Sequence, residues 1–216
     1  MMAHMEPSGD EIFTIVERLR GGDHAALAAL FAAYRDRLRR MVELRMDSRL
    51  RSRLDASDVL QEAYIGLTGD LNAFLADDRL TPLLWMRLHV GRRLTTLHRQ
   101  NLGVKMRDAG LEISLYRQAL PEASSAALAS MLLGRMTSPT QAAQRAERLL
   151  RVQEALNSLE PIDREILALR HFEQTNRAET AEILGITKEA AAKRYFRALQ
   201  KLKDVLGSMP GGWEAL

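Results

Sequence analysis

The chain has 216 residues and a net charge of +3, with 46% hydrophobic, 27% charged and only 5% aromatic residues, a balance that favours helices over a sheet. It contains no cysteine, which excludes disulfide frameworks and thiolate metal sites and is compatible with a reducing cytoplasm. No apolar run reaches the roughly 20 residues that cross a bilayer, and residues 1–10 lack the apolar core of a signal peptide, so we expect a cytoplasmic protein.

Four helices are expected before residue 108. The first ends at the Gly21–Gly22 pair. The second follows Asp23 as its N-cap, because apolar residues then recur every three or four positions. The third begins near Asp55, and the fourth begins at Pro82, since proline suits the first position of a helix. Between the third and fourth helices, glycine, aspartate and asparagine residues predict a loop over residues 70–80.

A change of composition divides the chain in two. Residues 109–139 are predicted to be a linker, because proline, serine and glycine interrupt the helical periodicity and the charge density falls. Leu128 and the apolar residues 131–133 are compatible with one short docked helix inside it. No segment shows convincing strand alternation. The fold class is therefore all-α, with two small helical domains at residues 10–108 and 140–207 joined by the linker.

The most informative segment is a pair of helices near the C-terminus. Ala181 is small where two helices must cross closely, and Gly185 can take the left-handed conformation that ends a helix. Ile186 then fills the gap between the helices, and Thr187 can cap the second one. This is a helix-turn-helix layout, whose second helix enters the major groove of DNA. That helix is basic, with no acidic residue over residues 193–203.

Candidate DNA contacts on this helix fall into two groups by position. Residues in its first turns face base edges, whereas basic residues further along meet phosphates. The candidate base readers are Lys188, Glu189, Ala192 and Lys193. Arg194 and Arg197 are assigned to phosphates. The alternative is a solvated basic face on an ordinary helical hairpin, and the motif together with the basic helix favours DNA binding.

Two motifs, in this order, carry a family resemblance. The first is DASDVLQEAY at residues 55–64, and the second is LEPIDREILALR at residues 159–170, followed by the helix-turn-helix. They resemble regions 2 and 4 of the sigma-70 family of RNA polymerase sigma factors, specifically its short extracytoplasmic-function (ECF) group. The arginine-rich stretch before Asp55 and the closing Ala-Leu-x-x-Leu resemble the ECF-type factors of planctomycetes. The resemblance covers most of residues 10–107 and 140–206.

This resemblance implies a factor that performs no chemistry. Its region 2 would bind core RNA polymerase and capture the opened −10 promoter element, and its region 4 would read the −35 element. The residues matched to polymerase binding are Asp55, Asp58, Gln61 and Glu62. Three of these four are acidic and share one helix face, although a solvated face with Asp55 as an N-cap is the alternative.

The two DNA sites are assigned in the same way. The residues matched to the −10 element are Asn72, Phe74, Arg87, Arg92, Arg93 and Arg99, whereas Trp85 is expected to anchor the core. The residues matched to the −35 element are Thr187, Lys188, Glu189, Ala192, Lys193, Arg194 and Arg197. Three departures from the family pattern leave the promoter sequence open. Arg92 or Arg93 replaces an asparagine, residues 189–191 read Glu-Ala-Ala where Gly-Thr-Val is frequent, and the linker is longer.

Two other classes of function are less compatible with the sequence. An enzyme is disfavoured because the five histidines lack metal-ligand spacing and no glycine loop or nucleophile motif occurs, so no catalytic residue, metal or cofactor is expected. An autonomous helix-turn-helix regulator would usually dimerise and bind a palindrome alone, whereas a sigma factor requires core polymerase. The expected partners are core RNA polymerase and promoter DNA, with an anti-sigma protein as a further candidate and no membrane.

Overall fold

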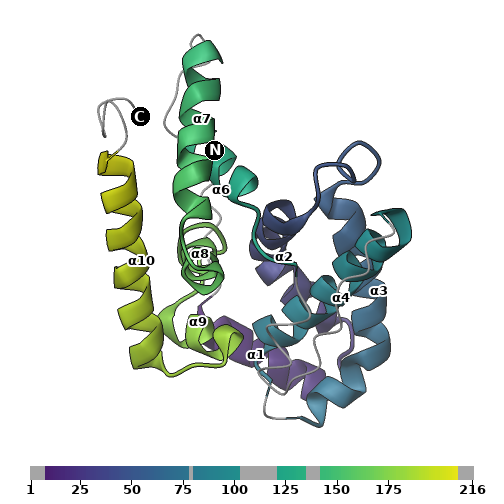
Figure 1. Ribbon diagram of the computed structural model, residues 1–216. Helices are drawn as coiled ribbons and strands as arrows, with labels where there is room; N and C mark the ends of the chain where they lie inside the picture. Colours follow the sequence, from purple (N-terminus) through teal and green to yellow (C-terminus); the bar gives the residue numbers. More distant parts are fainter. Residues whose placement is uncertain (1–7, 78–79, 103–120, 135–141, 209–216) are drawn as a thin grey trace. The chain divides into compact units, whose positions relative to one another are not determined.

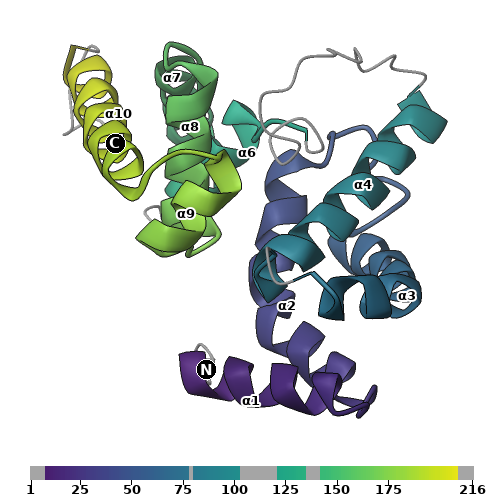
Figure 2. The ribbon, with the colours of Figure 1, turned by 90° about the horizontal axis from the view of Figure 1, so that it is seen from below.

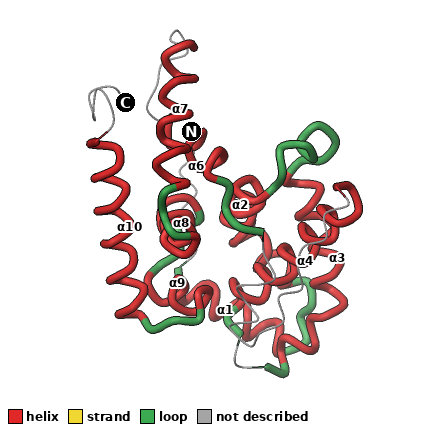
Figure 3. Tube along the Cα trace, viewed as in Figure 1, coloured by secondary structure: helices red, strands yellow, loops and turns green. Residues whose placement is uncertain are grey.

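The computed structural model describes residues 8–77, 80–102, 121–134 and 142–208, and the regular structure in these ranges is helical throughout (Figure 3). The all-α fold class is therefore confirmed. The chain divides into two compact units, residues 1–42 with 47–108, and residues 43–46 with 109–216. Within the described ranges, no helix is both long enough and apolar enough to span a bilayer.

The first unit is built from four helices: α1 (Gly9–Arg20), α2 (Ala26–Arg45), α3 (Ala56–Leu75) and α4 (Pro82–Leu102). Figures 1 and 2 show α4 between α2 and α3, with α1 across one end of them. Leu30, Leu67 and Leu94 bring side chains from α2, α3 and α4 into the core, and all three are fully buried. An edge-to-face contact between Phe31 and Tyr64, with ring centroids 5.0 Å apart, also joins α2 to α3.

Helix α3 is longer than the sequence indicated. Leu67, Leu71 and Phe74 follow one another at helical spacing and are all buried. Burial of this stripe outweighs the poor helix propensity of Gly69 and Asp70, because most helix stability in proteins comes from packing of an apolar face. The predicted loop over residues 70–80 is therefore wrong for residues 70–75.

The second unit contains α6 (Ser125–Gly134), α7 (Ala142–Asn157), α8 (Pro161–Leu167), α9 (Arg177–Leu184) and α10 (Lys188–Ser208), with a π-helical turn, η1 (Ala168–Phe172), directly after α8. Helix α10 packs against α7, α8 and α9, and these helices lie side by side in both ribbon views (Figures 1 and 2). Pro161 occupies the first turn of α8, a position that suits proline.

The short docked helix expected within the linker is present as α6. It packs against α7, and Leu128 and Leu133 are buried. Arg164 joins α8 to the start of α6, because its guanidinium donates to Ser125 Oγ (3.1 Å). The same guanidinium also donates to the Leu156 carbonyl of α7 (3.4 Å). Residues 109–120 and 135–139 of the predicted linker lie outside the described residues.

Candidate nucleic-acid interface

Both helices of the helix-turn-helix begin with a side-chain cap, and a left-handed glycine ends the first one. Asn176 Oδ1 accepts from the Glu179 amide (3.0 Å), and Glu179 Oε2 accepts from the Asn176 amide (2.8 Å), so α9 begins in a capping box. Gly185 ends α9 with φ 63° and ψ 36°, which is the left-handed conformation expected of it. Thr187 Oγ1 then accepts from the Ala190 amide (3.1 Å) and caps α10, as predicted.

These caps fix which side chains α10 presents. Ala191 and Ala198 are buried on the side of α10 that packs against α7, α8 and α9. Ala181 of α9 is also buried. The first turns of α10 therefore expose the candidate base readers Lys188, Glu189 and Lys193, while Ala192 is half-buried.

Arg194 and Arg197, the two residues assigned to phosphates, lie against a carboxylate. Asp163 of α8 is completely buried, and its Oδ1 lies 3.5 Å from both Arg194 Nη1 and Arg197 Nη2. Lys201 Nζ lies 3.2 Å from the other carboxylate oxygen. The sequence did not reveal this cluster because Asp163 lies more than thirty residues before the three cations. An acidic residue within the apolar stripe of α8 was the signal that could have revealed it.

Tyr195, the neighbour of Arg194, is held by the π-helical turn. The guanidinium of Arg170 lies 5.6 Å from the Tyr195 ring centroid, and His171 Nε2 lies 3.1 Å from the Tyr195 hydroxyl. Burial lowers the pKa of His171, and the nearby Arg170 lowers it further. Phe196, the next residue of α10, is 62% exposed and was not singled out from the sequence.

The acidic stripe of α3 has a structural role at its start. Asp55 Oδ1 accepts from the amides of Ser57 (2.7 Å) and Asp58 (3.0 Å), while Asp58 Oδ2 accepts from the Asp55 amide (2.8 Å). These two acids therefore form a capping box. Gln61 and Glu62 lie further along the helix and are exposed. Glu62 forms an ion pair with Arg93 of α4, so one residue matched to polymerase binding contacts one matched to the −10 element.

The residues matched to the −10 element separate by exposure. Asn72, Arg92 and Arg99 are exposed, and Arg93 is half-buried. Phe74 is only 7% exposed and stacks on Trp85 with centroids 4.2 Å apart and planes within 10°. The expectation that Trp85 anchors the core is confirmed. Arg87 is 2% exposed, so its guanidinium lies inside the first unit.

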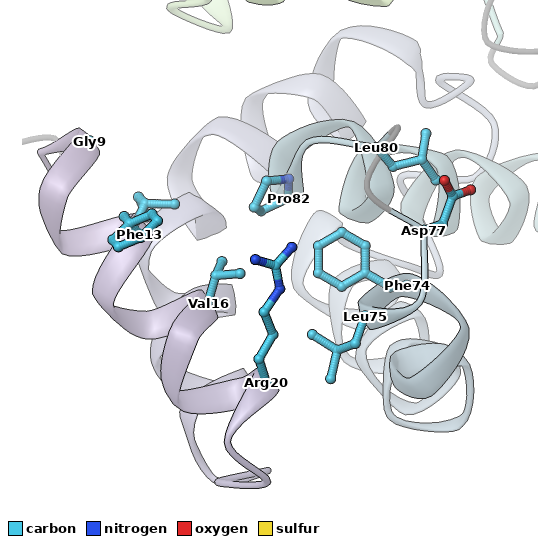
Figure 4. Close-up of a pocket in the computed structure, with 10 residues that line it drawn as sticks. Gly9, Phe13, Val16, Arg20, Phe74, Leu75, Asp77, Leu80 and Pro82 are labelled. Atoms are coloured by element: carbon cyan, nitrogen blue, oxygen red, sulfur yellow. The ribbon is translucent and has the colours of Figure 1, made fainter.

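A cavity of about 290 Å³ lies where α1 meets the segment between α3 and α4 (Figure 4). Phe13 and Val16 line it from α1, and Phe74, Leu75 and Pro82 line it from the other side. Its lining is mainly apolar, and Arg20 and Asp77 are its two charged residues. The part of the chain that the structure describes also holds no group of three potential metal ligands.

Comparison with known proteins points to one class. A family model described as sigma-70, region 4 matches residues 149–202, which contain α8, η1 and α9 and most of α10. The "ECF RNA polymerase sigma factor SigD" of Mycobacterium tuberculosis is 29% identical over 201 residues, covering 93% of this chain and 86% of the relative. The "RNA polymerase sigma-E factor" of Streptomyces avermitilis is 28% identical over 174 residues, covering 77% and 83%.

A solved structure described as CnrH in complex with the cytosolic domain of CnrY is similar in fold. It aligns with a TM-score of 0.50 over 91% of this chain and 97% of that chain. Because the two chains are only 18% identical, this likeness is evidence for the fold alone.

Proposed function

We propose that the chain is an RNA polymerase sigma factor of the ECF group of the sigma-70 family, and that its two units divide promoter recognition between them. The second unit binds the −35 element through α10. The observation that carries this assignment is the capped helix-turn-helix, which leaves Lys188, Glu189 and Lys193 exposed in the first turns of α10. Glutamate can accept from a cytosine amino group and lysine can donate to guanine, so these side chains supply base readout.

The first unit binds core polymerase and the opened −10 element. For polymerase, we assign the contact to Gln61 and Glu62, because Asp55 and Asp58 are engaged in capping α3. For the opened strand, the exposed residues Asn72, Arg92 and Arg99 are the direct contacts. The two arginines can bind the phosphates of an unpaired strand, and the Asn72 amide can hydrogen-bond an unpaired base.

The buried members of the same set act differently. Phe74 and Arg87 support the segment between α3 and α4 from inside rather than touching DNA, because each is less than a tenth exposed. Arg93 is half-buried and forms an ion pair with Glu62, so it is neither a fully exposed DNA contact nor a buried support.

Core RNA polymerase and promoter DNA are the partners, acting in the cytoplasm. We also propose a protein partner of the anti-sigma kind. The solved structure of similar fold is described as CnrH in complex with the cytosolic domain of CnrY. The resemblance to planctomycete ECF factors supports that subtype. An autonomous regulator is not favoured, because the relatives are RNA polymerase sigma factors. Sigma factors are not enzymes, and we propose no catalytic activity for this chain.

Dependence on core polymerase tests the function directly. In a gel shift with competitor DNA, the full chain should bind a promoter duplex specifically only when core polymerase is present. Adding the chain to core polymerase, with no other factor, should start transcription from that promoter. Specific binding of a palindromic duplex by the isolated chain, unchanged by core polymerase, would instead identify an autonomous regulator.

A matched pair of charge reversals tests the polymerase contact. Glu62 and Glu17 are both exposed glutamates that pair with an arginine, Glu62 with Arg93 and Glu17 with Arg20. Glu62→Arg should weaken association with core polymerase, whereas Glu17→Arg should not. Exposed ion pairs contribute about 0–1 kcal/mol, so both variants should fold. Equal core affinity in both would remove Glu62 from the interface.

A further inference from the structure

The cations on one side of α10 are already occupied inside the protein. Arg194, Arg197 and Lys201 recur at helical spacing and converge on the buried carboxylate of Asp163, at 3.5, 3.5 and 3.2 Å. Glu160, the residue just before α8, adds a second carboxylate, 3.9 Å from Arg194 and 3.6 Å from Lys201.

This arrangement changes the charge that α10 offers to DNA. The helix carries six basic residues, namely Lys188, Lys193, Arg194, Arg197, Lys201 and Lys203. Three of them share two carboxylates, so this side of the helix carries one net positive charge rather than three. Arg194 Nη1 is buried without a hydrogen bond of good geometry in the described structure. Coulombic attraction rather than a directed bond therefore holds it.

We propose that Asp163 and Glu160 are positioning residues that act as internal counter-anions, competing with DNA phosphates for Arg194, Arg197 and Lys201. The inference rests on the proposed binding of the −35 element by α10. Asp163 is completely buried and cannot touch DNA itself, so it acts only through the cations it holds. Opposite charges attract more strongly in a partly buried site than in water, which keeps these cations on the α8 side.

The consequence is a limit on binding that ignores sequence. Each phosphate that a cation neutralises adds about 0.9 to the negative slope of log affinity against log salt concentration. Because three cations are paired with carboxylates, fewer phosphates are neutralised and the salt slope stays small. The exposed base readers Lys188, Glu189 and Lys193 then contribute a larger share of the binding free energy. Sequence-independent binding to the many competing sites is thereby reduced relative to specific binding.

Three single substitutions in the full-length chain test this role. Asp163→Asn and Glu160→Gln each remove one carboxylate charge from the cluster. Asp204→Asn is the matched control, because Asp204 lies on α10, is exposed and hydrogen-bonds Gln200 (2.8 Å). All three variants gain one unit of net charge, so a difference between them reflects position and not total charge.

The measurement is fluorescence anisotropy of a labelled duplex without promoter elements, titrated with each variant at several salt concentrations. We expect Asp163→Asn to steepen the salt slope by about one or more relative to Asp204→Asn, with a smaller increase for Glu160→Gln. Sequence-independent affinity at low salt should rise several-fold. The double variant Asp163→Asn with Arg197→Ala should lose most of that gain, because Arg197 is 50% exposed and best placed to reach a phosphate.

Three outcomes separate the possibilities. A folded Asp163→Asn variant whose slope equals or falls below that of Asp204→Asn would overturn the inference and leave the proposed function intact. If Asp163→Asn does not fold, the exposed Glu160→Gln decides alone, and an unchanged slope overturns the inference. A wild-type chain that shows no salt-dependent DNA binding, with or without core polymerase, would refute both the role of α10 and the inference.

Discussion

Leu128 tests whether α6 belongs to the second unit or is only a connecting segment. Its side chain is fully buried where α6 packs against α7. Leu128→Ala removes three carbon atoms, worth about 0.8 kcal/mol each, so the transfer loss alone is about 2.4 kcal/mol. Any cavity that remains adds to this, within the range of about 2–5 kcal/mol for such changes. At about 4 °C per kcal/mol, the Tm of this unit should fall by roughly 10 °C or more.

Leu150 on α7 supplies the control for this prediction. It is 62% exposed, so Leu150→Ala makes the same chemical change at the surface and should alter stability by no more than about 0.5 kcal/mol. Differential scanning calorimetry and urea unfolding of the full chain measure both variants. If Leu128→Ala lowers the Tm no more than Leu150→Ala does, the packing of α6 contributes nothing and the reasoning is refuted.

Three further predictions concern named side chains. Burial lowers the pKa of His98, and its Nε2 accepts from the Asp47 amide, so the neutral imidazole favours folding. The free energy of unfolding should therefore be highest above about pH 6.5 and decline below it, and His98→Gln should flatten this decline in urea titrations across pH. Phe74→Ala should cost about 3–5 kcal/mol of stability, because Phe74 is buried. Asn72→Ala should leave the Tm unchanged and reduce the permanganate reactivity of the opened promoter. A loss of stability in Asn72→Ala, with a loss of promoter opening alone in Phe74→Ala, would exchange the two roles. Gly185→Ala should destabilise the second unit by about 1–2 kcal/mol in chemical denaturation, because the φ of 63° is costly for any residue with a Cβ; a neutral effect would show that the turn relaxes.

Local chemistry made much of the fold predictable. The glycine that ends α9, the threonine that caps α10 and the proline that starts α8 each have one strongly preferred place in a helix. The structure puts Gly185, Thr187 and Pro161 in those places. The loop prediction over residues 70–80 failed because propensity was weighed without packing. Phe74 completes a buried stripe, and that burial keeps the preceding glycine and aspartate helical.

The ion pairs of the candidate interface could not be predicted from the sequence, because each joins residues on different helices. Counting cations on α10 gave no sign that Arg194 and Arg197 face Asp163, since their proximity depends on how α8 and α10 pack. The ion pair between Glu62 and Arg93 was hidden for the same reason. Periodicity shows which residues share one helix face, but it does not show which neighbouring helix lies opposite them.

The stacked pair of Phe74 and Trp85 makes the first unit spectroscopically accessible. Trp85 is one of two tryptophans in the chain, and the other, Trp213, lies outside the described residues. A Trp213→Phe variant would leave a single indole, 4% exposed and resting on the last turn of α3. Its emission would then report on the segment between α3 and α4 alone, without an attached dye. Adding core polymerase and promoter DNA in turn would show at which step that segment changes.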